Sequence, residues 1–303
     1  MNATTQVQPA WWAPERLTDH LRQIGRAIRK KPLGMFSFFI IALVILAALF
    51  APLVAPHDPR TQIGAMSLAG PFSQAPDGTV YVFGGDPLGR DLFARVIFGA
   101  RTSLYIGLAS VAIGVVIGAA FGLVSGYLGG WRDTLLQRLM DMTMALPPLI
   151  LALLINSVLG SKTIYVLIAI AVVWIPTVNR VTRASVLSTK ERAYIQAAHA
   201  VGCSPTRVVL CHILPNILAP IVVIGTMMIA QAILLEASLS FLGLGVPPGT
   251  PSWGSMITQA RDYMTHNPHL LLFPGGALTL TILAFNLAGD YLRDLWDPKL
   301  RTL

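Results

Sequence analysis

Charged residues are scarce in this sequence. Only 12% of its 303 residues are charged, whereas 54% are hydrophobic, and the mean hydropathy is +0.65. An average soluble domain carries about 25% charged residues, so the composition excludes an ordinary soluble domain. We predict an integral membrane protein.

Motifs of the common enzyme classes are also missing. The sequence has no Gly-Lys dipeptide, which excludes a phosphate-binding P-loop, and no His-Glu-x-x-His or Gly-x-Ser-x-Gly motif. The six histidines are not interpreted as a metal site, and the two cysteines, Cys203 and Cys211, are interpreted as reduced thiols. We therefore expect no catalytic, cofactor-binding or metal-binding residue in this chain.

Apolar runs long enough to cross a bilayer occur six times. A helix needs about 20 such residues to span about 30 Å of hydrocarbon. The runs lie at 34–55, 102–126, 136–159, 163–185, 217–243 and 271–292. We predict an all-α, polytopic membrane protein with six transmembrane helices, in which Pro147, Pro148 and Pro176 kink their helices.

Basic residues orient the predicted spans. Six of them, from Arg16 to Lys31, precede the first span, so the N-terminus is expected to be cytoplasmic, and the even number of spans places the C-terminus on the same side. The net charge of +8 does not indicate nucleic-acid binding, because the basic residues form no patch interleaved with aromatics. On this topology the external basic residues are Arg60, Arg90, Arg95, Arg101, Lys162 and Arg261.

The predicted spans divide the chain into a tail, an anchor and a core. Residues 1–33 form a cytoplasmic tail, 34–55 an uncleaved anchor helix and 56–101 an external segment. The core at 102–292 holds the other five spans, with a cytoplasmic loop at 186–216 and an external segment at 244–270; residues 293–303 form the second cytoplasmic tail. Both external segments are expected to fold against the outer face.

Two features inside the spans need an explanation. The second span carries glycine at every fourth position, a stripe that favours close helix packing within this subunit over substrate contact; it consists of Gly114, Gly118, Gly122 and Gly126. Glu236, with Ser240 one turn later, either lines a translocation path or forms a hydrogen-bonded strut. Asp141, three residues after Arg138, is interpreted as a helical ion pair.

The cytoplasmic loop contains a folded turn. Residues 194–216, YIQAAHAVGCSPTRVVLCHILPN, are helical in character and are broken at Gly202. A second short helix is expected over 207–213, before the fifth span. Two short helices bent at a glycine, with Ala197 and Ala198 on a face that another protein can approach, indicate a contact site rather than a simple connection.

This loop resembles the signature of the permease subunits of binding-protein-dependent ATP-binding cassette importers. The signature reads Glu-Ala-Ala, three residues, Gly, then about nine residues before Ile-x-Leu-Pro. The chain shows Gln196-Ala197-Ala198, Gly202 and Ile213-Leu214-Pro215. Because glutamine replaces glutamate at residue 196, no salt bridge from this position is expected to be essential.

Four segments resemble the dipeptide, oligopeptide and nickel branch of this family, in the right order. They read GGDPLGRDLFARVIFGARTSL at 84–104, HILPN at 212–216, SLSFLGLGVPPGTPSWGSM at 238–256 and FNLAGDYLRDLWDPKL at 285–300. Short peptides are the favoured solute, and glutathione or a nickel chelate remain alternatives. Two other classes stay open: a proton-coupled secondary transporter with Glu236 as carrier, which should show internal repeats and more buried acids, and a membrane scaffold or receptor subunit.

The resemblance implies a type I importer permease fold and a complex of several proteins in the bacterial inner membrane, surrounded by lipid. A second, homologous permease would complete the channel, two cytoplasmic ATPase subunits would bind ATP and magnesium, and an external binding protein would deliver the solute. The missing P-loop fits this division, so the chain itself is not expected to be an enzyme.

The resemblance also assigns roles to residues. The ATPase-coupling loop would consist of Gln196, Ala197, Ala198, Gly202, Ile213, Leu214 and Pro215. The length and the Gly, Pro and Trp content of segments 56–101 and 244–270 predict that they cap the external mouth and receive the binding protein; the alternative is that they only seal the pore. The candidate contacts are Trp253, also expected to be a packing anchor, and Arg261 and Asp262 on an exposed rim.

Overall fold

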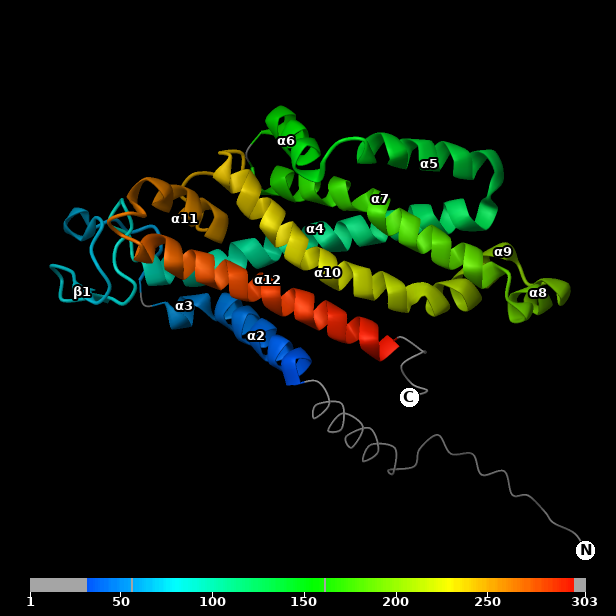
Figure 1. Cartoon of the computed structure of the whole chain (residues 1–303), viewed down its shortest axis with the longest axis horizontal. Helices are drawn as coiled ribbons and strands as arrows, with labels where there is room; N and C mark the ends of the chain where they lie inside the picture. The colour runs from blue at the N-terminus through cyan, green and yellow to red at the C-terminus, as the bar shows by residue number, and fades with distance from the viewer. Residues whose placement is uncertain (1–31, 56, 161, 297–303) are drawn as a thin grey trace, which may run out of the picture.

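Long apolar helices make up most of the computed structural model, which describes residues 32–55, 57–160 and 162–296. They lie side by side along the longest axis of the molecule (Figure 1). A short antiparallel hairpin, β1 (Ser73–Gln74) paired with β2 (Val80–Tyr81), belongs to the external segment. Residues 1–31 of the tail predicted at 1–33, and residues 297–303 of the tail predicted at 293–303, lie outside the described residues.

Four helices in the described part are long and apolar enough to cross a membrane. They are α4 (Leu92–Leu128), α7 (Thr163–Lys190), the helix that ends as α10 (Leu214–Phe241), and α12 (His269–Trp296). The first predicted span corresponds to α2 (Pro32–Leu49), which is shorter, followed by α3 (Ala51–Val54). The predicted number of six spans therefore stays a prediction.

The third predicted span, 136–159, is not a single helix. The chain forms α5 (Gly130–Met144) and α6 (Pro148–Leu159), and their axes are bent by 89°. Proline has no backbone N–H to bond to the preceding turn, and it disfavours helical geometry in the residue before it. Two adjacent prolines at 147 and 148 thus produce a break where a kink was expected, whereas α7 continues through Pro176.

The glycine stripe of α4 packs against α7. A Cβ atom added at Gly118 would lie 2.7 Å from the Ile175 carbonyl oxygen, and one at Gly122 would lie 2.6 Å from the Thr182 Cβ. These distances are too short for any side chain, so the two backbones are in direct contact. The predicted packing of the stripe within this subunit is confirmed.

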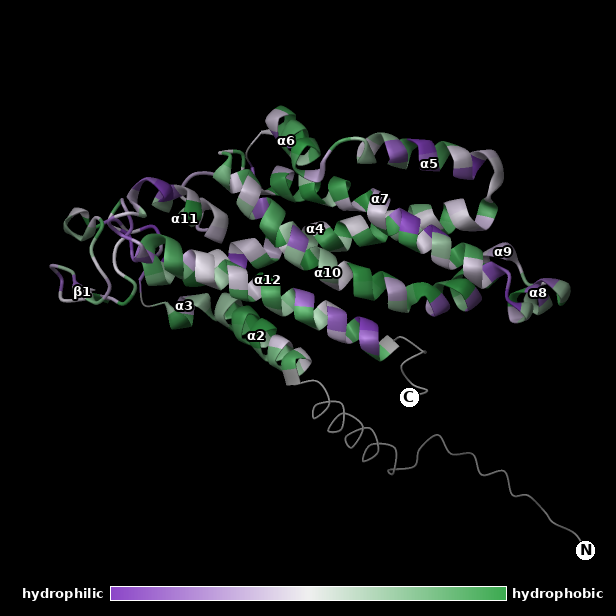
Figure 2. Cartoon of the chain, in the orientation of Figure 1, coloured by the Kyte–Doolittle hydropathy of each residue, from purple (hydrophilic) through white to green (hydrophobic). Residues whose placement is uncertain are grey.

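The buried core extends along the whole bundle, and apolar side chains also cover its outside. Trp253 and Phe285 belong to a cluster at one end, and Ile195 and Val208 to a cluster at the other. Figure 2 shows hydrophobic residues along most of the long helices and hydrophilic ones on α5, on the adjacent part of α7 and at the end that carries β1. An apolar exterior on long helices is the surface that a lipid bilayer requires.

Candidate functional site

The loop predicted to be cytoplasmic, 186–216, contains two short helices at one end of the bundle, opposite α11 (Trp253–Ala260) (Figure 1). The first, α8 (Ala193–Ala200), ends in a Schellman motif: the Gly202 N–H donates to the His199 carbonyl at 3.0 Å and the Cys203 N–H donates to the Ala198 carbonyl at 3.0 Å. Gly202 has a φ of +81°, which favours glycine over other residues. The predicted break at Gly202 is confirmed.

The second half of the loop continues into α10 without a break in the helix. Ser204 caps α9 (Pro205–Arg207), whose first residue is a proline, and a π-helical segment, η2 (Val208–Ile213), joins it to α10. The helix expected at 207–213 therefore does not end before the fifth span. Leu214 and Pro215 form the first turn of α10, where a missing N–H is tolerated.

The loop residues divide between an exposed face and a buried one. Gln196 and Ala197 are exposed, and the Gln196 Nε2 donates to the Glu191 carbonyl at 3.3 Å. Ala198 is only 8% exposed and belongs to the same cluster as Ile195. Successive residues of an α-helix point about 100° apart, so Ala197 and Ala198 do not share one approachable face. That part of the interpretation was wrong.

Two contacts join this loop to the spans beside it. The Lys190 Nζ, in the last turn of α7, donates to the Gly126 carbonyl of α4 at 3.1 Å. The rings of Tyr127 and His199 stack with their centroids 6.5 Å apart. The ring stack connects α8 to α4, and the Lys190 contact connects the end of α7 to α4.

A polar network connects α4, α5 and α7 in the half of the bundle that carries α8. The Arg183 guanidinium donates two hydrogen bonds to the Asp133 carboxylate, at 2.7 and 2.6 Å. Ser125 donates to the same carboxylate at 2.6 Å, and Gln137 donates to both Ser125 and Asn179. Sequence analysis missed this network, although its polar residues recur at helical spacing on α4, α5 and α7.

Asp141 forms an ion pair with a different helix from the one expected. Its carboxylate accepts from the Arg180 guanidinium at 2.7 Å, so the predicted pairing with Arg138 is wrong. The Arg180 and Asp141 side chains are 51% and 54% exposed. Arg180 precedes the end of α7 at Lys190 by ten residues, or about 15 Å. Exposed charges are costly against hydrocarbon, so this face of α5 and α7 suits water or another protein better than lipid.

Glu236 lies in a closed cluster at the outer end. Its side chain is fully buried and accepts hydrogen bonds from Ser240 at 2.8 Å and from Ser103 of α4 at 3.4 Å. Ser103 in turn accepts from the Trp253 backbone N–H at 3.3 Å, and the Trp253 indole donates to the Val96 carbonyl at 3.1 Å. This geometry joins α4, α10 and α11 and favours the strut interpretation of Glu236.

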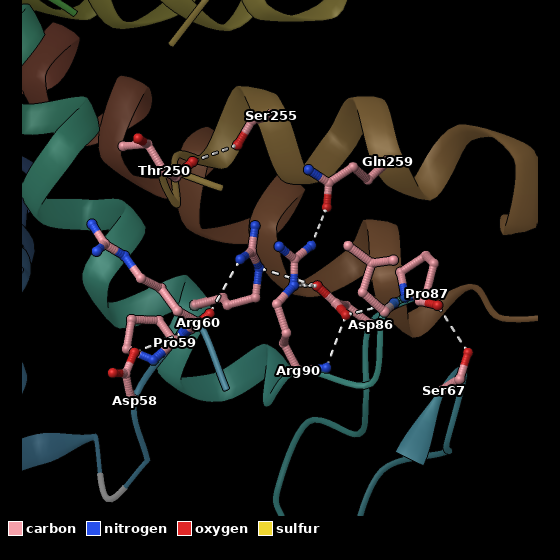
Figure 3. Close-up of polar contacts among 12 residues, drawn as sticks. Asp58, Pro59, Arg60, Ser67, Asp86, Pro87, Arg90, Thr250, Ser255 and Gln259 are labelled. Atoms are coloured by element: carbon pink, nitrogen blue, oxygen red, sulfur yellow. Dashed lines mark hydrogen bonds and ion pairs between the residues drawn. The ribbon is translucent and has the colours of Figure 1, made fainter. Parts of the chain in front are cut away.

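The two external segments are held together by buried arginines (Figure 3). The Asp86 carboxylate accepts from the Arg90 Nε at 2.6 Å and pairs with the Arg95 Nε at 3.2 Å. Arg90 also donates to the Gln259 side chain of α11 at 2.9 Å. The Arg90–Gln259 contact joins segment 56–101 to segment 244–270, while the Asp86 contacts order the first segment itself.

The predicted rim residues follow α11 directly. Arg261 and Asp262 belong to η3 (Arg261–Tyr263), and both are exposed. The Arg261 guanidinium lies 5.7 Å from the ring centre of Phe241. Trp253 is buried as a packing anchor, so it cannot itself be an exposed contact for another protein.

The sequence was compared with known protein families and with curated relatives. Residues 114–302 match the family described as binding-protein-dependent transport system inner membrane component, and residues 21–76 match the N-terminal transmembrane domain of oligopeptide transport permease C. The chain is 43% identical to the di/tripeptide transport system permease protein DppC of Pseudomonas aeruginosa, covering 91% of this chain and 90% of that protein. It is 41% identical to the glutathione transport system permease protein GsiD of Escherichia coli, covering 95% and 93%.

A solved structure supports the same fold. The MetNI methionine ABC transporter, in inward-facing conformations, matches with a TM-score of 0.54 over 66% of this chain and 96% of the matched chain, at 18% sequence identity. At this identity the match establishes the fold alone.

Proposed function

We propose how the tasks of transport are divided among the subunits of a complex. The starting point is that this chain belongs to the binding-protein-dependent transport system inner membrane components, in their dipeptide and oligopeptide branch. The chain is a peptide importer permease. In the proposed complex it forms the channel with a second, homologous permease in the bacterial inner membrane. Two cytoplasmic ATPase subunits bind ATP and magnesium, and an external binding protein delivers the peptide.

The observation that carries this proposal is the construction of the cytoplasmic loop. A flexible connection would need neither a Schellman motif at Gly202 nor a stack between His199 and Tyr127. The loop presents Gln196 and Ala197 to the outside while Ala198 holds α8 against the bundle. Such a rigid, exposed turn suits a contact that transmits force from an ATPase subunit to α4 and α7.

The translocation path is proposed to follow α5 and the cytoplasmic half of α7. These helices carry the exposed Asp141–Arg180 pair and the hydrophilic surface visible in Figure 2. Glu236 is enclosed by Ser103 and Ser240, so it contributes to the path by fixing the helices. A proton-coupled carrier that uses Glu236 is the less favoured alternative, because such a carrier needs access to the acid.

Purification through a tag on this chain tests the proposal. We expect the second permease and both ATPase subunits to copurify, and we expect ATP hydrolysis by the complex to increase when the binding protein is added with a dipeptide. Glutathione in place of the dipeptide distinguishes between the two kinds of substrate named for the relatives. A chain that purifies alone and supports uncoupler-sensitive uptake would contradict the proposal.

A further inference from the structure

A hollow at the outer end of the bundle collects basic side chains that have no part in coupling or in the proposed path. Its volume is about 530 Å³, and it is lined by α3, the beginning of the external segment, α4 and residues 250–251. Arg60 and Arg101 both line it. A second hollow of about 400 Å³ adjoins it and shares Arg60.

The two arginines of this hollow lack partners. Across residues 32–55, 57–160 and 162–296, neither guanidinium group has a hydrogen bond or an ion pair, and Figure 3 shows the Arg60 side chain extended without a contact at its tip. His57, also in the lining, is bound to Asp91 at 2.7 Å. Asp58 supplies the one carboxylate of the lining, and it accepts the backbone N–H of Arg60 at 2.8 Å. The hollow is therefore positively charged overall.

The hollow lies at the level expected for lipid headgroups. Arg101 directly precedes the apolar run of α4 that begins at residue 102, and Tyr105, one turn further, is 55% exposed. On the other wall Pro52 lines the hollow, and its neighbour Leu53 is 83% exposed. Basic and tyrosine side chains beside fully exposed leucine are typical of the boundary between hydrocarbon and water.

We propose that this hollow binds the phosphate group of an anionic phospholipid of the outer leaflet. Arg60 and Arg101 donate to the phosphate oxygens, the Thr102 hydroxyl lies beside them, and the acyl chains extend along Leu53. Two planar guanidinium groups suit a phosphate diester because each can donate two parallel hydrogen bonds. The volume falls within the range of about 300–1,000 Å³ that ligand sites have. The net positive charge disfavours lipids with a cationic headgroup.

Native mass spectrometry with phosphatidylglycerol as the probe tests this site. The chain is purified with whichever subunits accompany it, delipidated and titrated with phosphatidylglycerol or with phosphatidylcholine. Exchanging both arginines, Arg60→Ala with Arg101→Ala, should weaken the tightest phosphatidylglycerol binding by about thirtyfold, since each basic residue near an anionic lipid surface contributes about 1 kcal/mol. Arg60→Lys with Arg101→Lys should restore only part of the affinity, because lysine keeps the charge but cannot donate the two parallel hydrogen bonds of a guanidinium group.

A matched control removes two arginines elsewhere. Arg132→Ala with Arg261→Ala takes away the same charge from exposed positions that do not line the hollow, and should leave this binding unchanged. Equal phosphatidylglycerol affinity in the Arg60/Arg101 variant and the wild type would overturn the proposal. Displacement of bound phosphatidylglycerol by a soluble dipeptide would also overturn it, because the hollow would then belong to the solute. Neither outcome depends on whether the chain transports peptides.

Discussion

Because Gly122 has no side chain, the backbones of α4 and α7 pack in direct contact. The Cβ that any other residue would carry meets both Thr182 and the Asn179 carbonyl within 2.7 Å, and backbone atoms of a packed helix cannot move aside as a flexible side chain can. Polar side chains also connect helices in this region. Asp133 holds Arg183 and Ser125 together, so single side chains set the spacing of three helices.

A one-atom change at Gly122 should therefore destabilise the subunit. Gly122→Ala is expected to cost about 1–3 kcal/mol through overpacking of the α4–α7 contact. Gly276→Ala in α12 is the matched control, because an added Cβ there meets nothing within 4 Å, and it should be neutral or stabilising by up to about 1 kcal/mol. Thermal unfolding of both purified variants gives the comparison, and equal melting temperatures would contradict the packing role of the stripe.

The strut interpretation of Glu236 makes a second prediction at this scale. Glu236→Gln keeps an acceptor for the hydroxyl groups of Ser240 and Ser103, so peptide transport should remain near the wild-type rate. Glu236→Ala removes the acceptor and leaves a cavity, and should cost about 1–3 kcal/mol of stability. Transport by membrane vesicles at several pH values is the measurement. Loss of transport in the Gln variant, with a normal melting temperature, would instead favour a role for the carboxyl proton.

At the scale of elements, the proposed coupling loop joins a rigid turn to a less regular helix. The Schellman motif fixes α8, while the π-helical segment Val208–Ile213 connects α9 to α10. π-Helical turns are rare and are often found at functional sites, because they interrupt the regular hydrogen-bond ladder. This arrangement keeps the contact face of α8 rigid and places the irregular backbone next to the membrane.

Neighbouring alanines of α8 should respond differently to the same substitution. Ala197→Arg adds bulk and charge to the exposed face, so it should reduce transport and peptide-stimulated ATP hydrolysis together by tenfold or more, an estimate that corresponds to about 1.4 kcal/mol at the contact. The melting temperature of the subunit should not change. Ala198→Arg places a charge in the cluster around Ile195, and should lower the melting temperature itself.

Full transport by the Ala197→Arg variant would mean that this face contacts no other protein. Gln196→Glu serves as a tolerated variant at the adjacent exposed position, because it restores the residue usual in the family signature and should leave transport unchanged. Stability of the Ala198→Arg variant equal to that of the wild type would contradict the buried placement of Ala198.

The sequence predicts some of these elements and not others, for physical reasons. Gly202 and the glycine stripe were recognised because their effect depends on local backbone geometry and on helical spacing. The 89° break before α6 was underestimated, since an apolar run records the length of a span but not its direction. The pairing of Asp141 with Arg180 depends on which helices become neighbours. Spacing along the chain does not determine that.

The two regions proposed to contact other proteins lie at opposite ends of the bundle. The loop 186–216 lies at one end, and α11 with the segment that carries β1 lies at the other (Figure 1). The long helices between them extend from one region to the other, so a rigid-body movement at one end reaches the other without local unfolding. The hydrophilic face of α5 and α7 lies along this length (Figure 2).

If α5 borders a water-filled path, exposed residues on it should react with charged reagents inside the membrane. Met142→Cys, at a position that is 69% exposed, should be labelled by a membrane-impermeant thiol reagent in a background without Cys203 and Cys211. Leu280→Cys, 53% exposed in the middle of α12, is the control and should remain unlabelled because lipid covers it. Labelling at Leu280 without labelling at Met142 would place the path elsewhere.

ATP-driven peptide transport in liposomes tests the central claim most directly. In the orientation used, the lumen corresponds to the outside of the cell, so import appears as loss of peptide from the lumen. The complex purified through this chain is reconstituted into liposomes with the ATPase side outward and with ATP outside, and the binding protein and a labelled dipeptide are enclosed in the lumen. We predict export of the dipeptide from the lumen that requires ATP and the binding protein, is resistant to a protonophore, and is lost in the Ala197→Arg variant. Transport that persists without ATP and stops with a protonophore would contradict the assignment of this chain to an ATP-driven importer.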